Sequence, residues 1–112
     1  MRDVQVTQAE FSSVMQEIDE FVREKGWARQ DSSKPQTPRN LAASISIEAA
    51  ELLECFQWSD NATPKHIESE LADVLIYSLR FAQVAGIDPI EAIRKKLEFN
   101  RLRTWPRESV EG

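Results

Sequence analysis

The chain has 112 residues and a formal net charge of −5, so we expect one domain, residues 1–112, and no surface for non-specific binding of long DNA or RNA. Its single cysteine, Cys55, has no partner for an intrachain disulfide, and no apolar run approaches the ~20 residues that cross a membrane. These features predict a soluble cytoplasmic protein without a membrane partner.

The first predicted helix spans residues 8 to 25, where apolar side chains recur at helical spacing. Thr7 and Glu10 form a capping box at its start, and Gly26 stops the pattern. Residues 27–38 are rich in Ser, Pro and Thr and show no hydrophobic period. We expect a mobile loop there.

The second predicted helix runs from residue 39 or 40 to Phe56. The third has Thr63 as its N-cap and Pro64 at its first position, and it ends at Gly86. Its short connection to the second helix indicates that the two are antiparallel neighbours.

Asp88 and Pro89 repeat the cap and proline arrangement and start a fourth helix that passes Asn100. The tail at residues 107–112 is expected to be frayed. No alternating strand pattern occurs in the sequence. The predicted fold is therefore all-α, a four-helix bundle whose small protomer completes its core by forming an oligomer.

Two acidic pairs lie within the apolar parts of the second and third predicted helices: Glu48 with Glu51, and Glu70 with Asp73. At a spacing of three, both carboxylates of a pair lie on one helix face, so two packed helices would bring four acids together. Clustered negative charge is costly to bury without a cation, and oxygen ligands suit Mg²⁺, Mn²⁺ or Ca²⁺. A magnesium site is our first hypothesis.

These acids have two other interpretations. Acidic pairs are common on solvated helix faces, although the apolar residues around these pairs favour burial. A di-iron site requires a histidine three residues after a glutamate, and the single histidine, His66, follows Thr63 instead. The di-iron reading therefore fails.

The fourth predicted helix is basic, which could reflect complementarity with the helix dipole or a role in binding phosphate. An acidic metal site together with a basic helix suits a polyphosphate substrate, because the metal binds some phosphate oxygens and the cationic side chains bind the others. Trp27 and Trp58 flank loops, where an indole can stack on a base or close the edge of a core.

Three runs of sequence make the chain resemble the MazG-like nucleotide pyrophosphohydrolases, nearest to their dCTP pyrophosphatase branch. They are residues 38–41 (PRNL), 48–58 (EAAELLECFQW) and 70–77 (ELADVLIY). The basic helix adds Lys96, Asn100, Arg101 and Arg103 ahead of Trp105-Pro106. Where the dCTP branch has Phe-His, this chain has Pro35-Gln36, a departure that bears on base specificity.

This resemblance implies hydrolysis of a deoxynucleoside triphosphate, dCTP-like by preference, to the monophosphate and pyrophosphate. A metal-activated water would attack the α-phosphorus, and the biological purpose would be cleansing of the nucleotide pool. The four acids, Glu48, Glu51, Glu70 and Asp73, would form the catalytic metal site and hold Mg²⁺, with Mn²⁺ as a substitute.

The resemblance also assigns the substrate contacts. Lys96, Asn100 and Arg103 would hold the phosphates, Trp27 and Trp58 would sandwich the base or sugar, and Tyr77 would exclude a ribose 2′-hydroxyl. Members of the family form dimers or tetramers, and we expect a homotetramer rather than a dimer. Three alternatives remain at this point: an all-α dUTPase, a phosphoribosyl-ATP pyrophosphohydrolase, and a non-catalytic interaction module that binds a structural cation.

Overall fold

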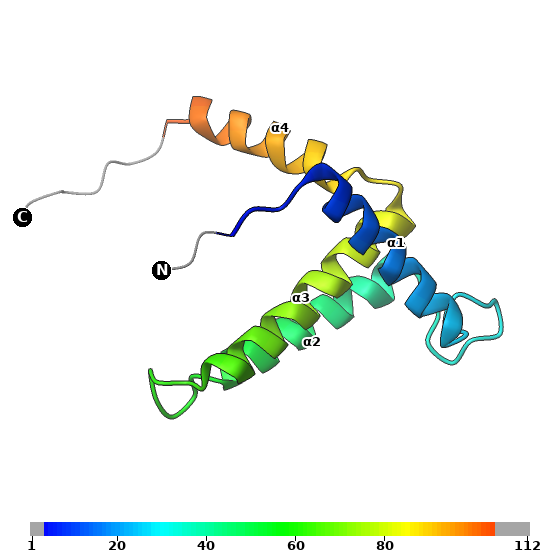
Figure 1. Ribbon diagram of the computed structural model, residues 1–112, viewed down its shortest axis with the longest axis horizontal. Coiled ribbons are helices and arrows are strands. Elements are labelled where there is room, and N and C mark those ends of the chain that lie inside the picture. The colour runs from blue at the N-terminus through cyan, green and yellow to red at the C-terminus, as the bar shows by residue number, and fades with distance from the viewer. Residues whose placement is uncertain (1–3, 105–112) are drawn as a thin grey trace, which may run out of the picture.

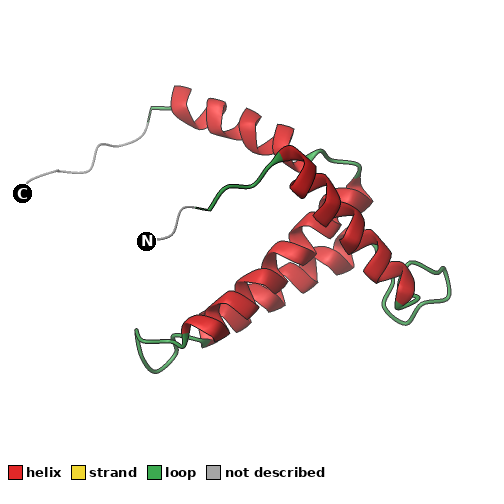
Figure 2. Cartoon of the chain, viewed as in Figure 1, coloured by secondary structure: helices red, strands yellow, loops and turns green. Residues whose placement is uncertain are grey.

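The computed structural model describes residues 4–104, and within that range it contains four helices and no strand (Figures 1 and 2). The all-α prediction is confirmed. The tail at residues 107–112, predicted to be frayed, lies outside the described residues. The helices are α1 (Gln8–Glu24), α2 (Pro38–Glu54), α3 (Pro64–Ala85) and α4 (Pro89–Leu102).

The helix boundaries follow local capping chemistry. The Thr7 hydroxyl accepts a hydrogen bond from the Glu10 amide at 3.1 Å, and the Asp88 carboxylate accepts from the amides of Ile90 and Glu91. Gly86 ends α3 in the left-handed conformation, with φ 68°, as the sequence predicts. Thr63 has the extended backbone of an N-cap, but its side chain makes no capping hydrogen bond.

Helix α2 begins and ends one or two residues earlier than predicted. Thr37 caps the helix by accepting from the Asn40 amide at 3.1 Å, and Pro38 occupies the first turn, so α2 begins within the predicted loop. It ends at Glu54, ahead of the predicted end at Phe56, because the amides of residues 55–57 each bond the carbonyl three residues back.

The α2 and α3 helices form an antiparallel hairpin, and α1 packs on α3 (Figure 1). The antiparallel neighbours predicted from the sequence are thus confirmed. Few apolar residues within 4–104 are buried: Ile18, Val22, Leu41 and Ala82. They lie where α1 and the start of α2 meet the second half of α3.

The described chain is open in shape. Its radius of gyration is 17.3 Å, whereas a compact domain of this length has about 13 Å. Figure 1 shows α4 projecting away from the hairpin, so the four helices do not close into a bundle within one chain. Leu53 and Leu75, expected to be buried from the apolar character of α2 and α3, are 71% and 51% exposed. No described helix is long and apolar enough to cross a membrane.

Candidate functional site

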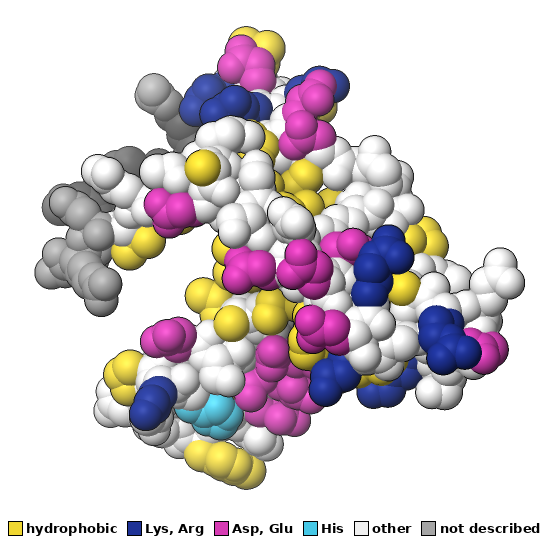
Figure 3. Space-filling view, turned by 45° about the vertical axis from the view of Figure 1, so that its right-hand side comes forward, with side chains coloured by type: hydrophobic (Ala, Val, Ile, Leu, Met, Phe, Trp, Pro, Cys, Tyr) yellow, Lys and Arg dark blue, Asp and Glu magenta, His cyan; other side chains and the backbone are white. Residues whose placement is uncertain are grey.

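The α2–α3 hairpin gathers acidic side chains from both helices. One carboxylate oxygen each from Glu48, Glu51 and Glu70 lie within 4.8 Å of one another, and all three side chains are half-buried. Asp73, also half-buried, lies one turn along α3 from Glu70 but is not in this group of three described acids. Figure 3 shows acidic side chains gathered in a patch beside exposed hydrophobic ones. The i, i+3 spacing within each helix and the antiparallel packing between them produce this convergence.

The cluster is electrostatically unfavourable without a cation. Burial, then a hydrogen bond with the Glu51 carboxyl and the charges of Glu51, Asp73 and Glu70, raise the pKa of Glu48 to about 7. The Oε2 atoms of Glu48 and Glu70 are buried and have no hydrogen-bond partner among the described residues. Buried carboxylate oxygens without a hydrogen-bond partner, within a group of three neighbouring acids, fit a hard divalent cation, because such an ion supplies both the missing charge and the missing partner.

His66 lies at the edge of this cluster. Its Nε2 is 3.4 Å from Oε1 of Glu70, one turn along α3, and its side chain is 61% exposed. His66 is therefore a surface residue. It contacts an acid of the cluster from the solvent side.

A pocket adjoins the acid cluster on the side of residues 25–37. Trp27, Gln36 and Tyr77 line two neighbouring cavities of about 210 and 420 Å³, and Asp73 lines the smaller one. Burial, followed by the charges of Glu48, Asp73 and Glu51, raises the pKa of Tyr77, so its hydroxyl remains a hydrogen-bond donor. The Tyr77 ring therefore connects the acids to an aromatic-lined pocket of suitable size for a base and sugar.

Trp58 does not share this pocket in one chain. It follows the C-terminal end of α2 and is 90% exposed, whereas Trp27 lies near Asn40 and Leu41 at the N-terminal end. The 17 residues of α2 separate the two ends by about 25 Å. A sandwich of one base between Trp27 and Trp58 thus requires Trp58 from another copy of the chain.

The predicted phosphate ligands are also apart from the acids of the same chain. Lys96, Asn100 and Arg103 belong to α4 and its C-cap, and α4 does not pack on the α2–α3 hairpin. The Lys96 Nζ lies 4.7 Å from the centroid of the Phe99 ring, and the Arg103 guanidinium lies 5.9 Å from it. Two cationic side chains therefore flank the exposed ring of Phe99, on a helix that projects away from the acids of its own chain.

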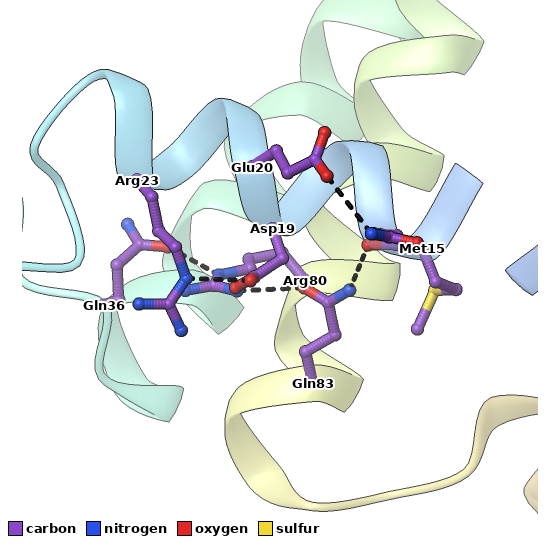
Figure 4. A network of polar contacts seen from close by, with 8 residues as sticks. Met15, Asp19, Glu20, Arg23, Gln36, Arg80 and Gln83 are labelled. Atoms are coloured by element: carbon purple, nitrogen blue, oxygen red, sulfur yellow. Dashed lines mark hydrogen bonds and ion pairs between the residues drawn. The ribbon is translucent and has the colours of Figure 1, made fainter. Parts of the chain in front are cut away.

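The structure also shows a buried polar network that the sequence analysis did not single out (Figure 4). Arg80 of α3 is 7% exposed, and it contacts Asp19 of α1, Gln83 of α3 and Gln36 of the loop. One signal was available in the sequence: Arg80 is the single charged residue between Asp73 and Asp88. A lone cation in so apolar a helix indicates a buried partner.

The sequence profile of the MazG-like family matches residues 43–111, which include both acidic pairs and α4. The chain belongs to the MazG-like family. It is 33% identical over 94 residues to dCTP pyrophosphatase 1 of Rattus norvegicus, a match that covers 75% of this chain and 52% of that protein. It thus spans about half the length of the curated relatives of this name that it matches. A dATP/dGTP diphosphohydrolase of cyanophage S-2L is 43% identical over 70 residues, which cover 62% of this chain and 60% of that protein.

Two solved structures resemble this MazG-like chain as a whole. A pyrophosphatase from Archaeoglobus fulgidus superposes with a TM-score of 0.76 at 38% identity, covering 94% of this chain and 100% of that one. The cyanophage S-2L MazG-like pyrophosphohydrolase, bound to dGDP and three catalytic Mn²⁺ ions per active site, superposes with a TM-score of 0.63 at 33% identity. That match covers 88% of this chain and 84% of that one.

Proposed function

We propose that this protein hydrolyses deoxynucleoside triphosphates to the monophosphate and pyrophosphate with the help of Mg²⁺ or Mn²⁺. The observation that carries the proposal is the convergence of unpartnered, half-buried carboxylates directly beside a pocket lined by Trp27 and Tyr77. A cation site next to an aromatic pocket matches the two ends of a nucleotide, its phosphates and its base. The similarity to enzymes named for dCTP and for dATP/dGTP supports this substrate class.

Glu48, Glu51, Glu70 and Asp73 would hold the metal. When bound, a divalent cation lowers the pKa of water and polarises phosphate oxygens. A carboxylate of the cluster would also orient the attacking water toward the α-phosphorus and accept its proton. Four acids on two rigid helices keep these groups in place before the substrate arrives.

Trp27 and Tyr77 would hold the nucleoside. The indole of Trp27 offers a face for stacking on the base, and its edge contact with Phe21, with ring centroids 5.6 Å apart, fixes its orientation. The Tyr77 ring, between the acids and the pocket, would occupy the space of a ribose 2′-hydroxyl. Selection of deoxyribose would thus depend on the bulk of one side chain.

The remaining substrate contacts would come from a second copy of the chain. Lys96, Asn100 and Arg103 lie on the outlying α4, and Trp58 lies at the far end of α2. The open shape and the exposed apolar side chains of α2 and α3 support assembly into a homo-oligomer, for which we favour a tetramer over a dimer. In that assembly the basic α4 of one subunit would face the acids of another and offset charge on the departing pyrophosphate.

A panel of nucleotides tests the proposal. We expect pyrophosphate release from deoxynucleoside triphosphates, greatest with dCTP, when Mg²⁺ or Mn²⁺ is present, and none after chelation. Ribonucleotides, dUTP and phosphoribosyl-ATP are included, because preferential turnover of either of the last two would replace the proposal with that activity. Absence of turnover with every nucleotide, combined with tight metal binding, would indicate a non-catalytic cation-binding module.

A further inference from the structure

Arg80 is an unusual residue for the interior of this protein. Its side chain is 9% exposed, and it is paired with the Asp19 carboxylate of α1 at 2.8 Å. Asp19 is itself held by Arg23 at 2.8 Å, and hydrogen bonds from Arg23 and then Arg80 lower its pKa. The charge of Arg80 is therefore compensated, and its guanidinium is fixed by packing and by a carboxylate that stays ionised.

The fixed guanidinium also holds Gln36, in the loop between α1 and α2. Arg80 Nε donates to Oε1 of Gln36 at 3.1 Å, as the dashed line in Figure 4 marks. A guanidinium has donors and no acceptor, so the oxygen of the Gln36 amide must face Arg80 and its nitrogen must face away. Among the described residues, that nitrogen donates one long bond, 3.4 Å, to the Lys34 carbonyl, and its second hydrogen remains available.

Gln36 occupies a position where this orientation matters. It lines both cavities that Trp27 and Tyr77 share, so its amide lies beside the place where the nucleobase would stack. Gln83, the other amide bound to Arg80, lines neither cavity, and its Nε2 donates to the Met15 carbonyl at 2.6 Å. The same guanidinium thus fixes one amide in the pocket and one outside it.

We propose that Arg80 is a positioning residue for base recognition, which locks the Gln36 amide with its N–H group toward the nucleobase. Gln36 then donates to a lone pair on the base edge, a carbonyl oxygen or ring nitrogen, and offers no acceptor to an exocyclic amine. A fixed Gln36 amide therefore discriminates between bases, whereas an amide free to rotate would bind base edges that accept a hydrogen bond as well as edges that donate one. This inference rests on the proposed nucleotide hydrolysis and adds to it the residue pair that sets base preference.

Gln36→Glu is the decisive variant, since it keeps the shape of the side chain and removes the donor. We measure kcat/KM for the four canonical deoxynucleoside triphosphates. The value for the best substrate should fall about 3- to 10-fold, the worth of one hydrogen bond, and the ratio between best and worst substrates should narrow. Arg80→Lys keeps the positive charge beside Asp19 but loses the planar guanidinium. It should therefore also reduce the ratio of kcat/KM between the best and the worst substrate.

Two further variants separate positioning from a merely structural role. Gln83→Met breaks the other amide contact of Arg80, so it should lower the melting temperature and leave the base ratio unchanged. In a Gln36→Ala background, Arg80→Lys should no longer affect the ratio, because Arg80 acts through Gln36.

The outcomes distinguish the inference from the function on which it rests. Absence of turnover in the wild type would overturn the proposed function. An active wild type whose base ratio is flat, or is unchanged by Gln36→Glu, would overturn the role of Gln36 and Arg80 alone. Gln36 lies on a loop and is half-buried, so its variants should fold even if Arg80→Lys does not.

Discussion

Glu48 carries a large part of the electrostatic cost of the acid cluster. Its pKa of about 7 exceeds its value of 4.5 in an unfolded chain, so the folded metal-free protein retains a proton that the unfolded chain releases between these values. The cation would displace this proton, which couples metal affinity to pH. Glu48 therefore destabilises the metal-free cluster and also makes the metal affinity depend on pH near neutrality.

The stability of the metal-free protein should accordingly fall as pH rises from about 5 to 7 and level off above that. The sign follows from the native state binding more protons than the unfolded state in this window. Thermal unfolding in chelator at several pH values measures it. Glu48→Gln, which has no proton to lose, should flatten the profile; an equal slope in wild type and variant would show that Glu48 is not the titrating group.

Glu51→Gln and Asp73→Asn should abolish hydrolysis, by at least about a hundredfold, since each removes a charged ligand of the cation. The metal-free proteins should keep their fold and gain some stability, because like-charge repulsion in the cluster is relieved. Activity assays, circular dichroism and thermal unfolding check this together. Unfolding of either variant, or turnover at the wild-type rate, would assign that acid a structural or dispensable role.

The convergence of Glu48, Glu51 and Glu70 agrees with the residue spacing, because i, i+3 pairs share a helix face and the two antiparallel helices pack side by side. The Arg80 network was not predicted. Its partners come from α1, from the loop and from α3, and Asp19 lies 61 positions from Arg80 in the sequence. Periodicity identifies which side chains share a face, but it does not identify partners that tertiary packing brings together.

At the scale of elements, all four helices were predicted, and only for α2 do both ends differ, since it begins and ends one or two residues earlier than expected. The combination of Thr37 and Pro38 was interpreted as loop composition, although the same pair is a cap followed by a first-turn proline. This difference affects the site, because the cap fixes the start of α2 next to Gln36 and Trp27. The hydrogen bond from the Asn40 side chain to the Pro35 carbonyl, 3.1 Å, ties the loop to the helix as well.

The apolar pattern of α2 and α3 predicted burial correctly only for the faces that these helices share with each other and with α1. Ile47, Leu53, Leu71 and Leu75 are each more than two-fifths exposed in the single chain. Helical periodicity of apolar residues indicates that a helix face is buried. It does not indicate whether that face packs on the same chain or on another copy of it. Assembly is therefore the physical reason we propose for this difference.

At the scale of the whole molecule, the separation of α4 from the acids predicts complementation between subunits. Glu51→Gln and Lys96→Ala should each be inactive. When the two are mixed and allowed to exchange subunits, sites that combine the intact acids of one chain with the intact α4 of another should form. In the simplest case, a random two-subunit exchange restores about a quarter of wild-type activity.

Each variant carried through the same exchange alone is the control and should remain inactive. Continued absence of activity in the mixture, with exchange verified by native mass spectrometry, would place Lys96 and Glu51 in the same chain's site. That result would contradict a site shared between subunits, but it would not contradict the role of the acid cluster.

The proposed role of the acids requires that the attacking water reacts at the α-phosphorus. Hydrolysis of dCTP in ¹⁸O-labelled water, with Mg²⁺ or Mn²⁺ and with product analysis by mass spectrometry, tests this directly. We predict that the products are dCMP and pyrophosphate and that the label appears in the monophosphate, because the acids would orient water toward the α-phosphorus. Label in pyrophosphate, or release of dCDP with inorganic phosphate, would contradict the account.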